Sequence, residues 1–258
     1  MPETLSTRAA ADVQTINHAL NVFVQGFAFT RSFTHPYVPE HVEGLWALRD
    51  APRRSGTCRS EEWFAHGMPP AEVDRIVRAH HRGRFAICTV LPVNEPDANL
   101  RAGYKALGYR LRTTEPIMVH PLRRIPRCSS PATIERVITP ALAQRLAQAA
   151  KARQVLPEHL TVKNPPLRQY VATMDGELVG WVRSIVVGDG AWCSNMYVVP
   201  RHRRQGIARA LLARMLRDDR AAGATTAVLS ASHAGAKLYT TLGYRQLATL
   251  YMWSTGKR

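Results

Sequence analysis

The segment VVPRHRRQGIARALLARMLRDDRAAGA, at residues 198–224, decides how the rest of this 258-residue sequence is interpreted. Apolar residues recur at helical spacing in its second half, at Ile207, Leu211, Leu212, Met215 and Leu216. This spacing predicts a long amphipathic helix from about Gln205 or Gly206 to about Gly223. A helix N-terminus has unpaired N–H groups and the positive end of the helix dipole, and arginines precede this one. The segment therefore also predicts an anion site.

The sequence on both sides of this helix predicts strands and one further helix. Gly-containing turns separate runs rich in β-branched and aromatic residues, which is the pattern of an antiparallel meander. The predicted strands lie at residues 132–139, 168–174, 178–187, 191–199, 227–231 and 246–253. Pro140 suits the first turn of a helix that reaches about Arg153.

One phrase occurs twice in the chain. YKALGYR at residues 104–110 returns as YTTLGYR at residues 239–245, and each copy follows a strand and a helical stretch and precedes an extended segment. The repeated unit is therefore predicted to be strand, helix, strand. Helices often end on a glycine with positive φ, so Gly108 and Gly243 are predicted to be structural helix caps.

The string at residues 198–208 resembles the acetyl-CoA signature (Q/R)-x-x-G-x-(G/A) of the GCN5-related N-acetyltransferases, the GNAT family. Its three fixed places hold Arg203, Gly206 and Ala208. The later phrase SHAGAKLYTTLGY resembles the closing motif of the same family. Its matching residues are Ser232, Gly235, Leu238, Tyr239, Leu242, Gly243 and Tyr244. The resemblance covers residues 131–255, and it implies an α/β (α+β) fold with a mixed, largely antiparallel sheet flanked by helices.

The resemblance also implies an acetyl-CoA site and assigns no metal. Backbone amides around the helix start would hold the CoA pyrophosphate, and the backbone of the preceding strand would pair with the pantetheine arm. Tyr239 matches the tyrosine that protonates the departing CoA thiolate. The implied cofactor-binding residues are Met196, Tyr197, Val198, Arg203, Arg204, Gln205, Gly206, Ile207, Ala208, Arg209 and Ser232.

The chemistry of acetyl transfer agrees with a tyrosine acid and leaves the base open. A phenol with a pKa of about 10 can protonate a departing thiolate, whose thiol has a pKa of about 8.5. A lysine-like amine, with a pKa of about 10.4, is mostly protonated at pH 7, so a base or a water relay would help it to attack. Residues 191–199 contain no carboxylate, and Glu177 falls in a hairpin turn. We therefore name no base.

The N-terminal half resembles only the later part of the same fold. Its counterparts of the long helix, the following strand and the closing helix lie at residues 70–81, 85–91 and 100–107. Glu61-Glu62 and Pro69-Pro70 stand where phosphate donors would be needed, and proline has no N–H to offer. We predict two tandem GNAT-type domains, a degenerate one at residues 1–128 that lacks the pyrophosphate loop and a complete one at residues 131–258.

The charge of the chain also favours the second half as the anion-binding part. The chain has 35 Lys and Arg against 19 Asp and Glu, a formal net charge of +16. Residues 131–258 hold 18 basic and 7 acidic side chains, and residues 1–130 hold 17 and 12. Basic proteins bind anions, among them phosphorylated ligands and nucleic acids. We expect CoA to use this charge, with nucleic acid as the less favoured partner.

Composition limits the compartment and the class of protein. With 45% apolar and 21% charged residues the chain is typical of a globular protein. No stretch approaches the ~20 apolar residues of a membrane span, and the N-terminus lacks the apolar core of a signal peptide, so we expect a cytoplasmic protein without a membrane partner. The cysteines have no C-x-x-C spacing, which favours reduced thiols over zinc or disulfides. They are Cys58, Cys88, Cys128 and Cys193.

The sequence thus predicts an acetyl-CoA-dependent N-acetyltransferase that transfers acetyl directly to an amine, with a small molecule as acceptor. The alternatives are a protein or aminoacyl-tRNA acetyltransferase and a non-catalytic CoA-binding regulatory protein. A homodimer, the acceptor and the role of the first domain stay open. Charged and aromatic residues at 46–54 and 59–63 are candidates for lining an acceptor pocket, or for core packing and surface ion pairs.

Overall fold

The computed structural model describes residues 3–31, 37–50 and 60–255, with side chains within 14–31, 38–49 and 60–255. The chain forms two compact units, and each unit joins segments that are far apart in the sequence. Unit 1 comprises Met1–Met118, Ser230–His233 and Gln246–Arg258, and unit 2 comprises Val119–Leu229 and Ala234–Arg245.

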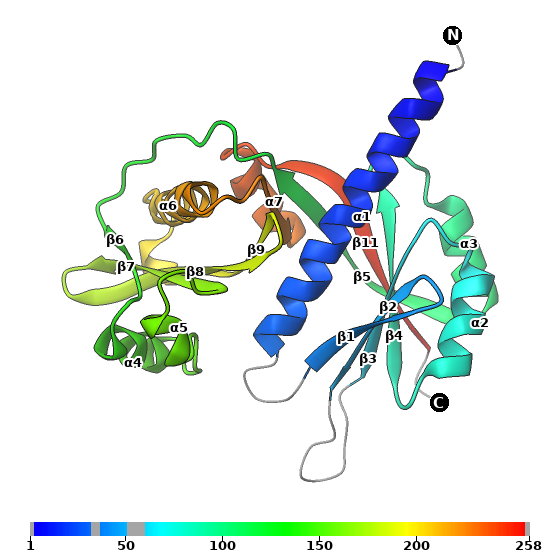
Figure 1. Cartoon of the computed structure of the whole chain (residues 1–258), viewed down its shortest axis with the longest axis horizontal. Helices are drawn as coiled ribbons and strands as arrows, with labels where there is room; N and C mark the ends of the chain where they lie inside the picture. Colours follow the sequence, from blue (N-terminus) through cyan, green and yellow to red (C-terminus); the bar gives the residue numbers. More distant parts are fainter. Residues whose placement is uncertain (1–2, 32–36, 51–59, 256–258) are drawn as a thin grey trace. The chain divides into compact units, whose positions relative to one another are not determined.

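Unit 1 is a mixed sheet with helices packed against it. Its elements are α1 (Glu3–Arg31), β1 (Tyr37–Val42), β2 (Leu45–Asp50), β3 (Glu61–His66), α2 (Pro70–His80), β4 (Phe85–Pro92), α3 (Ala98–Ala106), β5 (Tyr109–His120) and β11 (Arg245–Thr255). The strand order is β1-β2-β3-β4-β11-β5 (Figure 1). Strands β3 and β4 run parallel, and the pairs β1–β2, β2–β3 and β4–β11 run antiparallel.

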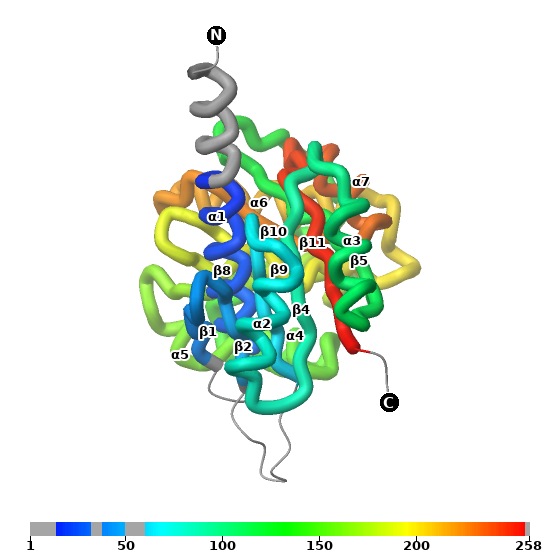
Figure 2. Tube along the Cα trace, turned by 90° about the vertical axis from the view of Figure 1, so that its right-hand side faces the viewer, coloured from blue at the N-terminus to red at the C-terminus, as the bar shows by residue number. Residues whose placement is uncertain are grey.

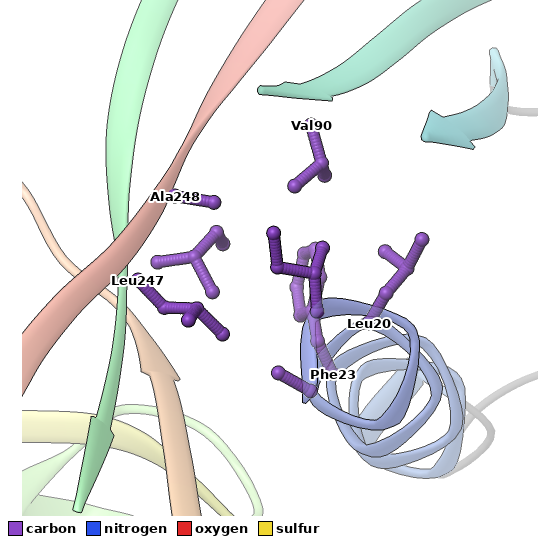
Figure 3. Close-up of a pocket in the computed structure, with 8 residues that line it drawn as sticks. Leu20, Phe23, Val90, Leu247 and Ala248 are labelled. Atoms are coloured by element: carbon purple, nitrogen blue, oxygen red, sulfur yellow. The ribbon is translucent and has the colours of Figure 1, made fainter. Parts of the chain in front are cut away.

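Helix α1 packs on one face of the sheet of unit 1. Leu20 and Phe23 of α1 lie against Val90 of β4 and against Leu247 and Ala248 of β11 (Figure 3). All five side chains are buried, and the space that they enclose has no room for a water molecule. This space is therefore part of the packed core and is no ligand pocket.

Strand β11 belongs to unit 1 although it follows the second copy of the repeated phrase. It lies beside β4 (Figure 2), with Trp253 opposite Ile87. Trp253 is buried and stacks on Tyr104 of α3, with ring centroids 4.7 Å apart. The compact units therefore differ from the predicted segments 1–128 and 131–258 in this strand, in Ser230–His233 and in residues 119–128. The aromatic side chains of β11 explain its place, because they complete the core of unit 1.

Unit 2 contains further strands of mixed direction with helices packed against them. Its elements are β6 (Thr133–Arg136), α4 (Pro140–Ala149), α5 (Glu158–Thr161), β7 (Leu167–Met174), β8 (Glu177–Val187), β9 (Gly190–Val198), the 3₁₀ helix η1 (Pro200–His202), α6 (Ile207–Ala221), β10 (Thr226–Ser230) and α7 (His233–Thr240). Strands β9 and β10 run parallel, and the other neighbours in the order β6-β7-β8-β9-β10 run antiparallel. Helix α6 lies on one face of this sheet, and α4 and α5 lie on the other (Figure 1). The predicted fold class, α/β with largely antiparallel sheets flanked by helices, is confirmed.

Both glycines of the repeated phrase end a helix in the left-handed region. The φ angle is +82° at Gly108 and +99° at Gly243. A Cβ atom at Gly243 would also lie 3.0 Å from Nε2 of His120. The structural role predicted for these two glycines is confirmed, because a side chain at either position would strain the backbone.

The charged side chains around Trp63 hold the sheet of unit 1 together. The buried carboxylate of Glu61 accepts hydrogen bonds from Trp63 Nε1 at 3.0 Å, from the backbone N–H of Arg82 at 2.7 Å and from Arg49 Nε at 3.3 Å. The Arg49 guanidinium lies 4.8 Å from the centroid of the Trp63 ring. These contacts favour core packing over pocket lining for this part of the chain. Residues 51–59, which include Cys58, lie outside the described residues.

A buried ion pair joins α6 to the sheet of unit 2. Arg168 Nη1 donates to Asp219 Oδ1 at 2.9 Å, and Ser184 Oγ donates to Asp219 Oδ2 at 2.8 Å. Burial raises the pKa of Asp219 to about 6, although Ser184 and Arg168 lower it, so desolvation outweighs the pairing. A carboxyl group with a raised pKa in the folded state favours folding at low pH. This contribution is lost as the pH rises from about 4 through about 6.

Replacing Arg168 with Met is expected to lower the free energy of unfolding by about 3–5 kcal/mol, because the Asp219 carboxylate would stay buried without its cation. Chemical denaturation at pH 7 measures this loss. The control Arg214→Met breaks a partly exposed pair with Asp218 and should cost no more than about 1 kcal/mol. Adding Asp219→Leu to Arg168→Met should recover most of the stability. Equal losses in the two single variants would contradict this account.

Candidate active site

The strand that leads toward α6 contains a β-bulge. The pairing of β8 with β9 passes from Trp181 opposite Tyr197 to Arg183 opposite Ser194, so β9 holds one more residue than β8 over this stretch. Asn195 has a φ of +54° there. Asparagine enters the left-handed region more readily than most residues with a side chain. The bulge bends β9 and re-aims its side chains.

Strand β9 also leaves its parallel neighbour β10 after a short ladder. The ladder covers Gly190 to Trp192 of β9, whereas the strand continues to Val198. In the part of the chain that the structure describes, the backbone from Cys193 onward has no β10 partner on that side. An extended ligand could pair with these free backbone groups as an additional strand.

The corresponding strands of unit 1 stay paired. Strands β3 and β4 are also parallel and are also connected by a helix, but their ladder runs from Glu61 opposite Phe85 to His66 opposite Val90. This ladder covers the whole of β3 without a shift in register. The edge that β9 leaves open in unit 2 is therefore occupied in unit 1.

Two residues with positive φ shape the N-terminus of α6. Gly206 is the N-cap with a φ of +81°, and Arg204 has a φ of +68°. No side chain caps this helix, and the N–H groups from Ile207 to Arg209 have no hydrogen-bond partner among the described residues. A Cβ atom at Gly206 would lie 3.0 Å from the carbonyl oxygen of Ser129. This position therefore favours glycine, and the neighbouring N–H groups remain open to an anion.

The arginines at this helix start have different environments. Arg203 Nε donates to the carbonyl oxygen of Val198 at 3.0 Å, and its guanidinium lies 6.0 Å from the centroid of the Tyr197 ring. Arg203 thus ties the loop to the end of β9. Arg204 and Arg209 are exposed and form no ion pair within the described ranges of the chain. Their charge is available to the phosphates of a ligand.

Tyr239 lies on α7 with its ring half-buried. Its ring centroid is 5.7 Å from that of Tyr244, and no described residue forms a hydrogen bond with its hydroxyl. Burial, with a smaller effect from the Cys193 thiol, raises the pKa of Tyr239, so the phenol stays protonated at neutral pH. Cys193 is the first residue of β9 beyond the β10 ladder. Tyr239 therefore lies near the point where the two strands part.

The remaining predicted cofactor residues lie in the same part of unit 2, with one exception. Met196 and Ala208 are half-buried and Gln205 is exposed. Ile207 is buried in the core, so only its backbone can meet a ligand. Ser232 belongs to unit 1. The cofactor roles of these residues stay predictions.

Two features of this site were not predicted from the sequence. One is the bulge, whose only signal is the polar pair Ser194-Asn195 inside a largely apolar strand. The other is Arg183 of β8, whose Nε donates to Ser194 Oγ at 3.1 Å. Glu177, the carboxylate that the sequence places in the hairpin turn, forms an exposed ion pair with Arg201. Its pairing and exposure favour a structural role at the hairpin.

Within residues 3–31, 37–50 and 60–255, no three His, Cys, Asp or Glu side chains gather closely enough to hold a metal ion. No helix in these ranges is both long and apolar enough to cross a membrane. Cys88, Cys128 and Cys193 are free thiols.

One family model matches part of the chain. A family model described as "Acetyltransferase (GNAT) domain" matches residues 165–246, the stretch from the start of β7 to the start of β11. No curated protein matches the chain.

Solved structures share the fold over most of the chain. A GCN5-related N-acetyltransferase from Kribbella flavida is 18% identical with a TM-score of 0.63, and the match covers 91% of this chain and 94% of that one. A GCN5-related N-acetyltransferase from Sphaerobacter thermophilus is 18% identical with a TM-score of 0.54 and coverage of 81% and 75%. A tandem GNAT protein from the clavulanic acid biosynthesis pathway is 15% identical with a TM-score of 0.51 and coverage of 86% of each chain.

Proposed function

We propose, since residues 165–246 of this chain form a domain of the GCN5-related N-acetyltransferase family, that the protein is an acetyl-CoA-dependent N-acetyltransferase that acts directly on an amine. The observation that carries this proposal is the course of β9. It leaves β10 after Trp192 and leads to the N-terminus of α6, where no side chain caps the helix. A ligand that is extended in one part and anionic in another fits this arrangement, and CoA has this form, with its pantetheine arm and its phosphates.

The two parts of CoA would contact different parts of unit 2. The pyrophosphate would bind the N–H groups at the start of α6, where Gly206 allows a close approach and Arg204 and Arg209 add charge. The pantetheine arm would pair with the β9 backbone near Met196 and Val198, beyond the ladder with β10. Ser232 is assigned a polar contact on the strength of the family motif alone.

Tyr239 would act as the general acid. The amine nitrogen attacks the thioester carbonyl carbon and the carbon–sulfur bond breaks. The Tyr239 hydroxyl then gives its proton to the departing thiolate, and the amine loses its own proton to water. We assign no side chain as base, because β9 carries no carboxylate and Glu177 is paired with Arg201. Since an amine with a pKa of about 10.4 is mostly protonated at pH 7, the rate should rise with pH through the neutral range.

Release of the CoA thiol over a panel of acceptors tests this proposal. A panel of small amines, peptides and aminoacyl-tRNA separates a small-molecule acceptor from the two macromolecular alternatives. Tight acetyl-CoA binding without CoA release for any acceptor would favour the non-catalytic CoA-binding protein. Failure to bind acetyl-CoA at all would refute the proposal.

The cytoplasm is the compartment that we propose for this reaction. The three free thiols in the described part of the chain support a reducing compartment. Acetyl-CoA and the amine are the partners that the reaction requires, and a homodimer remains a prediction without a test in this structure.

Each chain is expected to bind one CoA, in unit 2. One reason is that the β3–β4 ladder in unit 1 fills the edge that β9 leaves open in unit 2. The other is that Pro69 is the N-cap and Pro70 the first residue of α2, whereas α6 has a glycine N-cap. Calorimetric titration of the intact chain with CoA should give a stoichiometry near one. Gly206→Glu should remove all of the binding heat. If the chain had two equivalent sites, this variant would keep half of the heat, and the remaining site would lie in unit 1.

A further inference from the structure

The chain between β5 and β6 is bound to α6 by hydrogen bonds from the helix. This connecting segment, residues 121–130, contains no helix or strand and passes along α6 on its way to β6 (Figure 1). Arg220 Nη1 donates to the carbonyl oxygen of Arg123 at 3.3 Å, and Arg217 Nη1 donates to the carbonyl oxygen of Pro126 at 3.3 Å. The connecting segment therefore follows the helix in the opposite direction, starting from its last turn.

Small residues of α6 let the connecting segment lie close to the helix. Ala210 and Ala213 precede Arg217 by seven and four residues, so they share its face of the helix, and both are buried. At the helix start, the carbonyl oxygen of Ser129 would lie 3.0 Å from a Cβ atom at Gly206. This face of α6 is therefore covered along its length and cannot insert into a nucleic-acid groove as a recognition helix does.

Arginines surround the covered face of α6, and no carboxylate neutralises them. The connecting segment contains no Asp or Glu, and the two carboxylates of α6 are already paired, Asp218 with Arg214 and Asp219 with Arg168. Within the described residues, the arginines of this basic surface form no ion pair. They are the exposed Arg123, Arg124, Arg127 and Arg220 and the half-buried Arg217.

The proposed CoA site uses little of this charge. The pyrophosphate would bind at the first turn of α6, next to Arg204 and Arg209. Arg220 follows Arg209 by eleven residues, which places it about 17 Å further along the helix axis. The basic surface therefore extends well beyond the helix start and offers charge to a second, longer anion.

The surface fits a polymer of phosphates better than a lipid bilayer. A guanidinium is a planar fork of donors that matches a phosphate group. Helix α6 has 15 residues and is about 22 Å long, the length over which one nucleic-acid strand of a duplex carries roughly six phosphates. In the described part of the chain, neither α6 nor the connecting segment exposes a large apolar side chain, which a helix lying in a membrane surface would need.

The backbone of the connecting segment favours RNA over DNA. Within the described ranges, the N–H groups of residues 123–125 and 127–129 have no hydrogen-bond partner. Such groups can donate to phosphate oxygens and also to a ribose 2′-hydroxyl, which DNA lacks. Arginine side chains can in addition stack on the bases of a single strand.

We propose that the basic surface of unit 2 binds single-stranded RNA through its phosphates and its 2′-hydroxyls. Arg123, Arg124 and Arg127 contact the phosphates, while Arg217 and Arg220 hold the connecting segment on α6. This partner is independent of the proposed acetyl transfer, because the basic surface lies outside the CoA site.

The test measures fluorescence anisotropy of a labelled 20-nucleotide single-stranded RNA of mixed sequence, with the protein saturated with CoA so that the helix start is already filled. Wild type should bind with a Kd in the micromolar range at 0.1 M salt. The triple variant Arg123→Gln, Arg124→Gln, Arg127→Gln should bind about 30- to 100-fold more weakly. The slope of log K against log salt should shrink by about 2, because each single-strand phosphate contact contributes about 0.7.

A matched variant removes three charges elsewhere on unit 2. Arg145, Lys151 and Arg153 are exposed and lie on or just after α4, on the other face of the sheet (Figure 1). Replacing all three with Gln should leave the RNA affinity within about twofold of wild type. The side chains of Arg123, Arg124 and Arg127 form no hydrogen bond or ion pair within the described residues, so both triple variants should keep the wild-type unfolding transition.

Other polyanions decide whether the partner is RNA. The DNA strand of the same sequence should bind about fivefold more weakly, the effect of about one net hydrogen bond. A 20-residue polyglutamate and vesicles with anionic lipids should not compete with the RNA. Absence of RNA binding at 0.1 M salt, equal losses in the two triple variants, or equal affinity for DNA or polyglutamate would overturn the proposal. None of these results depends on acetyl transfer, so the proposed function is judged separately by release of CoA.

Discussion

Replacing Tyr239 with Phe is expected to lower kcat by about 100-fold or more, with CoA binding little changed, because the ring remains and only the donated proton is lost. Burial raises the pKa of Tyr239, which keeps the phenol protonated over the working pH range. A thiolate that leaves into the same buried surroundings has its own pKa raised for the same reason, so the proton can still pass to it. Single-turnover release of CoA measures the effect on the chemical step.

Tyr244 provides a matched control for this experiment. Its ring lies 5.7 Å from that of Tyr239, and its side chain is 2% exposed, so its hydroxyl cannot meet a ligand without a change in the core. Tyr244→Phe should leave kcat within about twofold of wild type. Equal turnover in wild type and Tyr239→Phe would make Tyr239 a packing residue, and equal losses in the two variants would indicate a general effect on the core.

Gly206→Glu is expected to abolish acetyl-CoA binding, with an affinity at least about 100-fold lower in calorimetry. The new carboxylate would stand among the N–H groups that receive the pyrophosphate, and the new Cβ would lie 3.0 Å from the Ser129 carbonyl oxygen. Gly206 also has a φ of +81°, so any side chain there adds backbone strain. The affinity must therefore be measured on protein whose folding has been verified by its unfolding transition.

Two controls divide the effect into strain and charge. Gly206→Ala brings the same backbone strain without the carboxylate and should bind more tightly than Gly206→Glu. Gly188→Glu brings the same carboxylate to a hairpin glycine with a φ of +56° and open space around its Cβ, and should bind CoA like wild type. Unchanged affinity in Gly206→Glu would remove the cofactor assignment at α6.

The elements of the chain that depend on local pattern could be predicted from the sequence. The helix predicted from about Gln205 or Gly206 to about Gly223 occupies Ile207–Ala221, and its start has the glycine N-cap that a close backbone approach needs. The strands of the meander begin and end within one residue of their predicted bounds at most of their ends, because glycines in the turns determine where the strands stop. The loop of the candidate site could be predicted for the same reason, because the spacing of the apolar residues indicates where the helix begins.

Features that depend on distant contacts could not be predicted. Strand β11 looked like the last strand of the second domain, and only the pairing of Trp253 with Ile87 and its stacking on Tyr104 assign it to unit 1. The bulge depends on how β8 and β9 register, which no local pattern fixes. The hydrogen bond from Arg183 Nε to Ser194 Oγ was missed because it depends on which residues of β8 and β9 lie opposite each other.

The place of β11 ties the formation of unit 1 to the order in which a ribosome makes the chain. Its partner in β4 is finished by residue 92, and the matching residues of β11 follow roughly 160 residues later, which at 5–20 residues per second is a delay of about 8–30 s. During that interval one edge of β4 lacks its neighbour and the core lacks Tyr251 and Trp253. The part of unit 1 that is synthesised first can therefore acquire its complete core only after the strands of unit 2 have been made, and a gene fragment that ends before β11 would lack part of that core.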